Sequence, residues 1–339
     1  MESFGAGRRA LTGTGGGRRR RRSAERQMVP DVEFTSYYGR PIVKASPWTA
    51  DIPGYLFLGG LAGGSALLGA GADLTGKPAL RRTARFGALG AITASLGLLV
   101  HDLGRPSRFL NMLRVAKPTS PMSVGTWLLS AFGPAVGAAA VGELSGLLPG
   151  RLGRLVSVAS RPAGLAAAAI GPAVASYTAV LISDTATPTW HEGHREMPFV
   201  FVGSAALAAG GLGMLGAPVS QAGPARRLAL GGVALELAAA QAMEKSMGIT
   251  AEPLHQGQAG MLMKASKALT VLGGLGTLLA GRDRRIAMAS GAALLAGSAC
   301  TRFGIFHAGQ QSARDPKYTV VPQRERLAAR QDGHRPAVQ

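Results

Sequence analysis

Cysteine is almost absent from this chain of 339 residues, which holds only Cys300. A single cysteine excludes an internal disulfide and cannot ligate an iron-sulfur cluster, so any such cluster must belong to a partner. Histidine is scarce too, with six in the chain, and no two of them face each other inside a hydrophobic run. We therefore expect neither haem nor a metal site here.

Acidic residues are also few, with 18 Asp and Glu against 37 Lys and Arg. The basic residues gather near both ends of the chain and in short clusters, and the apolar blocks between the clusters are each about 20 residues long. A nucleic-acid-binding protein would instead interleave basic residues with aromatic and polar ones along a folded surface. The distribution argues against nucleic acid and is typical of a membrane protein.

The apolar blocks predict an all-α integral membrane protein of about eight transmembrane helices, arranged as two four-helix bundles. We expect the spans at residues 52–72, 84–101, 122–144, 163–182, 198–215, 228–247, 265–280 and 286–306.

The connections between the spans alternate in kind. Four are short and basic, such as the one that holds Arg81 and Arg85. The other three are longer and chemically varied, at residues 102–121, 183–197 and 248–264. With eight spans, the three long loops and both termini share one side of the membrane.

Four regions follow from this pattern. Residues 1–27 are rich in Gly and Arg, lack a signal-peptide core and are expected to be disordered, with Met28 as an alternative start. Residues 28–51 form a segment on the partner side, 52–306 the membrane domain and 307–339 a polar tail. The positive-inside rule puts the short basic loops in the cytoplasm, whereas the Arg-rich first residues favour the opposite orientation.

Glycines in the apolar spans predict close helix packing. The first span contains overlapping small-xxx-small pairs, made by Gly59, Gly60, Gly63 and Gly64. A GxGxxG pattern at 211–216 lies inside an apolar span, without the preceding strand that a dinucleotide site needs. We interpret it as helix packing as well.

Glu236 is the clearest charged residue inside a span. A charge near the bilayer centre costs at least about 2.5 to 3.5 kcal/mol and is tolerated mainly where it faces protein or water. Glu244, eight residues later, lies on broadly the same side of the helix. The pair suggests a proton path, and the alternative is a neutral carboxyl bonded to a neighbouring helix.

Two further pairs lie near the long-loop side of the membrane. Asp51 and Tyr55 share one helix face, and Tyr177 and Asp184 share another. Together they predict a polar pocket for a quinone, which needs an apolar cleft, hydrogen-bond donors and a group that passes protons, a role to which we also assign Asp184. The alternative is that the tyrosines are interfacial anchors.

Several long motifs carry a family resemblance. From about residue 28 to residue 326 the chain reads, in order, YYGRPIVKASPW, DIPGYLFLGGLAGGSALL, DLGRPSRFLNMLRV, SPMSVGTWLL and FHAGQQSARDPKYTVVPQRER. These stretches resemble the polysulfide reductase membrane-subunit family, which is also called NrfD-like or PsrC-like.

The resemblance implies a haem-free, eight-helix subunit of the inner (plasma) membrane that binds menaquinone or ubiquinone. It also implies a ferredoxin-like iron-sulfur partner, which serves a molybdopterin-type catalytic subunit. Membrane lipid surrounds such a subunit, and the resemblance leaves open whether the subunit forms a homo-oligomer.

The family's quinone site maps onto Asp51, Tyr55 and Tyr177 of this chain. Its DLGRP motif includes Asp102 and Arg105, which we expect to pair and shape a loop beside the pocket or to contact quinone or partner directly. In the next long loop we expect two aromatic side chains to cover the pocket or to meet the iron-sulfur subunit, namely Trp190 and His191.

Two other functional classes remain open from the sequence. A proton-coupled secondary transporter would use Pro134 and Pro172 as breaks in discontinuous helices and Glu236 as the coupling acid. A purely structural membrane anchor would leave Glu236 and the tyrosines replaceable.

Overall fold

The computed structural model describes residues 40–333, with side chains to residue 328, and this part is helical without any strand. The expected disorder of residues 1–27 lies outside the described residues. The described part of the chain has eight long helices, which are α1 (Asp51–Leu74), α2 (Pro78–Asp102), α3 (Pro121–Gly142), α4 (Gly150–Ser183), α6 (Met197–Gly216), α7 (Gly223–Ser246), α8 (Gly257–Leu279) and α9 (Arg284–Arg314).

Each long helix covers one of the predicted spans. Six of them, α1, α2, α3, α4, α6 and α9, are long and apolar enough to cross a membrane. The other two, α7 and α8, match predicted spans in position and fall short of that apolarity. Charged residues lower it, among them Glu236 in α7 and Lys267 in α8. The all-α membrane fold predicted from the sequence is confirmed.

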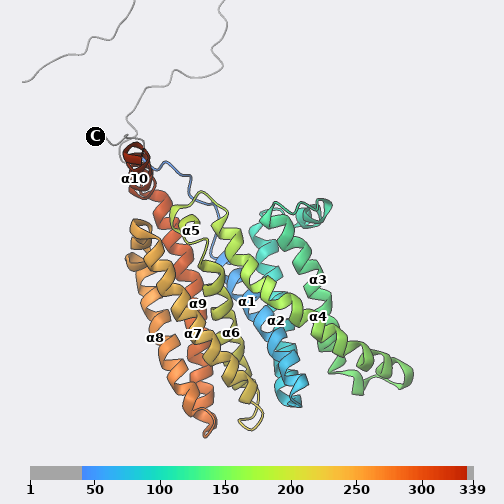
Figure 1. Cartoon of the computed structure of the whole chain (residues 1–339). Coiled ribbons are helices and arrows are strands. Elements are labelled where there is room, and N and C mark those ends of the chain that lie inside the picture. Colours follow the sequence, from blue (N-terminus) through green and yellow to red (C-terminus); the bar gives the residue numbers. More distant parts are fainter. Residues whose placement is uncertain (1–39, 334–339) are drawn as a thin grey trace, which may run out of the picture. The chain divides into compact units, whose positions relative to one another are not determined.

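The long helices form the two predicted four-helix bundles (Figure 1). In the first bundle α1 packs on α2 and α4, and α3 packs on α4. In the second bundle α6 packs on α7 and α9, and α8 packs on α9. The bundles meet mainly where α1 and α4 contact α6. The seams between α2 and α3 and between α7 and α8 are much less closely packed.

Glycines bring the helix backbones into contact, as their spacing predicted. A Cβ atom on Gly63 of α1 would overlap the carbonyl oxygen of Gly171 in α4, and the reverse contact is equally close. Gly64 approaches Ala205 of α6 in the same way. Gly211, from the GxGxxG pattern, lies against α9. These glycines therefore serve helix packing.

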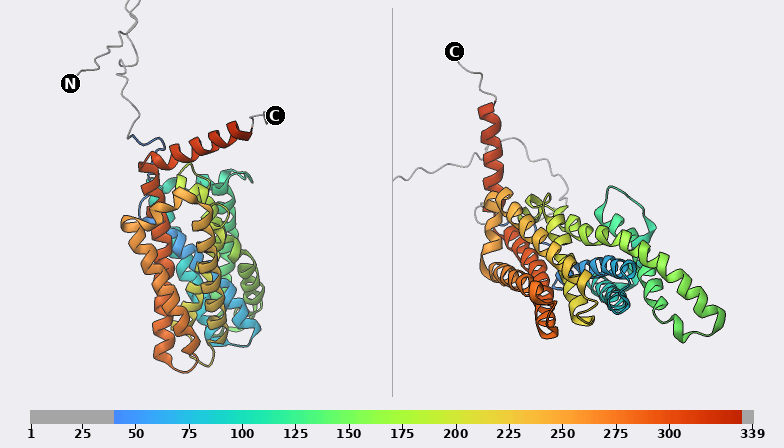
Figure 2. Two further views of the ribbon diagram at one scale, coloured as in Figure 1. Left: turned by 60° about the vertical axis from the view of Figure 1, so that its left-hand side comes forward. Right: turned by 60° about the horizontal axis from the view of Figure 1, so that its bottom comes forward.

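The shorter elements lie mostly at one end of the bundles (Figures 1 and 2). We call this the long-loop end, because the three longer connections lie there. Its elements are η1 (Pro106–Arg114), α5 (Pro188–Glu192), η3 (Gly248–His255) and α10 (Lys317–Gly333). The opposite, short-loop end includes η2 (Ser145–Leu147).

The predicted polar tail after residue 306 is largely helical, since α9 continues to Arg314 and α10 follows. The Lys317 ammonium lies 2.8 Å from a carboxylate oxygen of Glu252 in η3, and the Tyr318 hydroxyl lies 3.3 Å from the same oxygen. The hydrogen bond from Lys317 holds the pKa of Glu252 below its ordinary value and raises the pKa of Lys317. These contacts fix the start of α10 at the long-loop end.

The basic residues predicted at the first short connection lie in a helix and not in a loop. Arg81 and Arg85 lie within α2, and both pair with Glu143, the residue that follows α3, at 2.7 and 2.9 Å. Arg81 also pairs with Asp73 of α1. Arg85 is buried and also donates to Ser160 of α4. The helices therefore extend beyond their apolar stretches, and carboxylates neutralise the charges there.

The two prolines do not interrupt their helices. Pro134 lies inside α3 and Pro172 lies inside α4, and both helices continue past them. The discontinuous helices that would favour a secondary transporter are therefore not found at these positions.

Candidate functional site

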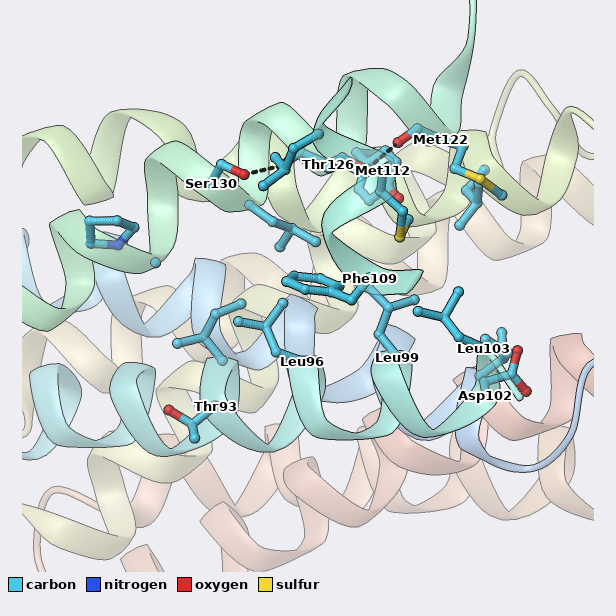
Figure 3. A pocket seen from close by; sticks show the side chains of 18 of the residues that line it. Thr93, Leu96, Leu99, Asp102, Leu103, Phe109, Met112, Met122, Thr126 and Ser130 are labelled. Carbon is cyan, nitrogen blue, oxygen red and sulfur yellow. Dashed lines mark hydrogen bonds between the residues drawn. The ribbon is translucent and has the colours of Figure 1, made fainter. Parts of the chain in front are cut away.

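A cavity of about 530 Å³ lies along the seam between α2 and α3. Apolar side chains from both helices make up most of its wall, and η1 closes it on one side. In Figure 3, Phe109 of η1 lies between Leu96 and Leu99 of α2 and Thr126 of α3. We call this space the first cavity.

The first cavity is elongated. On α2 its lining runs from Asp102 at the long-loop end to Leu89, which is about 20 Å at 1.5 Å per residue. On α3 it runs from Met122 to Pro134. The space has the shape and apolar walls that suit a flat ring with a hydrocarbon tail.

Tyr177 of α4 provides a hydroxyl in the wall of the first cavity. The hydroxyl of Tyr55 in α1 donates to the Tyr177 oxygen at 3.4 Å. Both side chains are buried, with 1% and 8% of their surface exposed. A tyrosine hydroxyl can accept one hydrogen bond and donate another, so the Tyr177 hydroxyl can also donate to a partner in the cavity. The structure thus brings together the two predicted tyrosines.

Two small residues, one of them a glycine, position this pair. Gly125 of α3 leaves room for the Tyr177 ring, since a Cβ atom there would overlap the ring. Ser95 of α2 donates to the backbone oxygen of Tyr55 at 3.1 Å. No sequence pattern indicated the role of Gly125, because that role depends on where the tyrosine ring lies.

A chain of polar side chains leads from the long-loop surface to the first cavity. Asp51 lies 2.7 Å from Nδ1 of His101, which is exposed. The Thr49 hydroxyl is 3.1 Å from a carboxylate oxygen of Asp51 and 3.1 Å from one of Asp102. Asp102 lines the cavity. Asp51 is therefore linked to the cavity by the contacts of Thr49 with Asp51 and with Asp102.

Two parts of this arrangement differ from expectation. Asp102 bonds Thr49, and no ion pair joins it to Arg105 among the described residues; the Arg105 side chain is exposed. His101, which was not assigned to the site from the sequence, is the partner of Asp51. Two consecutive membrane helices run antiparallel, so the start of α1, with Asp51, lies beside the end of α2, with His101. The order of the spans in the sequence could have indicated this contact.

Trp190 and His191 do not line the first cavity. Trp190 is fully buried behind Trp48, with ring centres 5.9 Å apart, and Trp48 is the residue that reaches the cavity. The indole nitrogen of Trp190 donates to the Ile305 oxygen of α9 at 2.8 Å. The ring of His191 stacks on His194. The role of both residues toward a partner stays a prediction.

The family model for polysulphide reductase, NrfD, matches residues 42–219, more than half of the chain. The chain belongs to the NrfD family. It is therefore a multi-pass membrane protein, and the family implies a membrane subunit of quinone-linked oxidoreductase complexes. The match spans the whole lining of the first cavity. A search of curated proteins finds no match.

A second cavity, of about 650 Å³, lies beyond the matched residues of this NrfD-family chain. It follows the seam between α7 and α8 and is more polar than the first. Glu236 lies at its inner end, and Glu244 and His255 lie toward the long-loop end, 3.5 Å apart. Lys264 and Lys267 of α8 also line it. As the sequence predicted, Glu236 and Glu244 face the same side.

Glu236 is buried and only partly bonded. One carboxyl oxygen accepts from Thr301 of α9 at 2.6 Å, and the other has no partner among the described residues. Thr270, in the same cavity wall, has an unpartnered hydroxyl as well. Buried polar atoms of this kind are normally satisfied by water, for which the cavity has room.

Arg302 lies next to Thr301 and was not singled out from the sequence, although it is a charge within an apolar span. Its guanidinium is fully buried and lies 3.7 Å from the centre of the Phe201 ring in α6. It donates to the Phe201 oxygen at 2.8 Å. Asp184, by contrast, is exposed at the end of α4 and lines neither cavity.

Proposed function

We propose that this subunit exchanges electrons between a membrane quinone and an iron-sulfur subunit docked at the long-loop end. The observation that carries the proposal is an elongated apolar cavity lined by a buried tyrosine, Tyr177, whose hydroxyl contacts that of Tyr55. Family membership supports the same role.

The residues present fit a quinone. The apolar side chains of α2 and α3 suit the hydrocarbon tail, and the Tyr177 hydroxyl would donate a hydrogen bond to a ring oxygen. A bound quinone supplies the site with a carrier of two electrons and two protons. Menaquinone and ubiquinone both meet this description.

The chain's own residues provide a path for the protons. We assign it to Asp102, Thr49, Asp51 and His101, which are linked by contacts of 2.7 to 3.1 Å and end at the long-loop surface. Tyr55 holds Tyr177 in place by its hydrogen bond. Protons taken up or released at the cavity would then exchange with that side of the membrane.

We place the partner subunits at the long-loop end as well, where the proposed proton path reaches the surface. We place a ferredoxin-like iron-sulfur subunit on the long-loop end, near Trp48 and His191, and a molybdopterin-type catalytic subunit beyond it, at the inner membrane. Purification in mild detergent tests this arrangement. An iron-sulfur subunit should be retained, and a chain that purifies alone and takes up solute would contradict it.

We further propose that Glu236 and Glu244 carry protons in the second cavity. Replacing Glu236 by Gln keeps the bond from Thr301 and removes the proton-carrying group. We expect proton translocation, measured with a pH indicator inside reconstituted vesicles, to fall about a hundredfold while quinol oxidation with an uncoupler persists. Translocation equal to wild type would exclude Glu236 from the path, and exposed Glu325→Gln is the control.

The apolar groove predicts a dependence on tail length. Gly133 lines the first cavity and a Cβ atom there would meet nothing within 4 Å, so we expect Gly133→Phe to place its ring in the groove. We expect KM for long-tail quinols to rise about tenfold, as for the loss of roughly 50 Å² of buried apolar surface, and KM for tail-less quinols to change little.

Gly137 gives a matched control for this substitution. It lies one turn further along α3, has equally open space and does not line the cavity. Gly137→Phe should leave both KM values unchanged. An equal effect of the two substitutions on long-tail quinols would contradict the placement of the tail.

A further inference from the structure

The connection between α2 and α3 is strongly basic. From Leu103 to Gly142 the sequence contains no Asp or Glu, while residues 103–120 contain three arginines and one lysine besides. These four side chains are exposed and make no ion pair among the described residues; they are Arg105, Arg108, Arg114 and Lys117. The segment therefore presents uncompensated positive charge at the long-loop end.

Large apolar side chains are exposed on the same segment and on the α3 turn beside it. Leu110 is 68% exposed, Val115 is 57% exposed and Trp127 is 47% exposed. No residue of η1 is buried. Basic and apolar side chains exposed together, with a tryptophan between them, are characteristic of segments that lie at a membrane surface.

The segment is also fastened to the start of α3. The Ser123 hydroxyl donates to the Val115 oxygen at 2.9 Å and accepts from the Lys117 amide at 2.9 Å. The Trp127 indole donates to the same Val115 oxygen at 3.3 Å. Because α3 is a membrane span, these bonds hold the basic residues close to the bilayer surface.

We propose that residues 103–120 bind the phosphate headgroups of anionic phospholipids. The four basic residues match that charge, and the exposed apolar side chains enter the adjoining acyl region. An acidic protein surface would match the charge and leave Leu110 and Trp127 exposed to water, so lipid is favoured. The lipid contact is independent of the quinone assignment.

The contact has a consequence that does rest on the proposed function. Phe109 and Met112 of the same segment lie in one wall of the first cavity (Figure 3), and Leu113 lines the cavity as well. Headgroups that hold the segment down would keep this wall in place. Anionic lipid would then set how readily a quinone passes the wall.

Amide hydrogen exchange of the full chain in lipid nanodiscs tests the binding itself. We expect exchange across residues 103–120 to be at least about fivefold slower in discs with phosphatidylglycerol than in pure phosphatidylcholine, since each basic residue near an anionic surface contributes about that factor. The triple variant Arg108→Gln, Arg114→Gln, Lys117→Gln should lose most of this difference between the two lipids.

A second triple variant controls for lost charge. Arg227→Gln, Arg282→Gln, Arg285→Gln removes three exposed bases from the short-loop end and should keep the lipid-dependent difference. Equal exchange of the wild-type segment in both lipids would overturn the proposal. Slowing that needs the iron-sulfur subunit and not the anionic lipid would also overturn it and make the segment a docking surface. Either result leaves the quinone role standing.

Discussion

A complex carrying Tyr177→Phe is expected to lose quinol-linked turnover by about a hundredfold or more, while dye-linked activity of the catalytic subunit persists. The substitution keeps the ring against Gly125 and removes the hydroxyl that we assign to the quinone oxygen in the first cavity. Donors and proton carriers at a reacting group contribute about this much. Steady-state oxidation of a quinol analogue by the intact complex measures the effect.

The control for this substitution is Tyr318→Phe. Tyr318, at the start of α10, is a third buried tyrosine; it bonds Glu252 of η3 and does not line the first cavity. Its loss should leave quinol turnover unchanged. Removing the Tyr177 hydroxyl leaves the buried Tyr55 hydroxyl without its acceptor, which costs about 1 to 3 kcal/mol, so the variant should still fold. Wild-type turnover in the Tyr177 variant would show that the site is elsewhere.

The second large effect concerns folding. Gly63→Ala is expected to lower the free energy of unfolding by about 3 kcal/mol, because the new Cβ would meet the backbone oxygen of Gly171, which cannot rotate away as a side chain can. Close approach of α1 and α4 also places Tyr55 beside Tyr177. We therefore expect quinol turnover to fall together with stability.

A substitution at Gly71 in the same helix is expected to raise the free energy of unfolding instead of lowering it. A methyl group added at Gly71 would have no neighbouring atom within 4 Å, so Gly71→Ala should stabilise the protein by roughly 0.5 to 1 kcal/mol through helix propensity alone. Thermal unfolding of the two variants in the same detergent compares them directly. Shifts of the same sign would contradict the helix contact.

The sequence predicted the spans well because the bilayer requires long apolar helices. It failed where helices leave the apolar region. The helix α4 begins at Gly150 rather than near Ala163, and the segment that extends it contains Arg151 and Arg154. The helix α9 likewise continues to Arg314. Apolarity marks the membrane, and a helix can continue beyond it.

The candidate sites were predicted unevenly for a similar reason. The Tyr55 and Tyr177 pair and the shared side of Glu236 and Glu244 follow from helical spacing, which the sequence displays. His101 and Thr49 join the first site through contacts between α1, α2 and the segment before α1, which spacing within one helix cannot reveal. The same holds for Gly125, whose part depends on a ring from another helix.

The most direct measurement is photo-crosslinking of the intact complex with an azido-quinone, followed by peptide mapping. The account predicts label in the residues that line the first cavity, on α2 and α3 between 89 and 134 and near Tyr177, and loss of that label with excess unmodified quinone. Competable label on α7 and α8 around the second cavity, with none on α2 and α3, would contradict it.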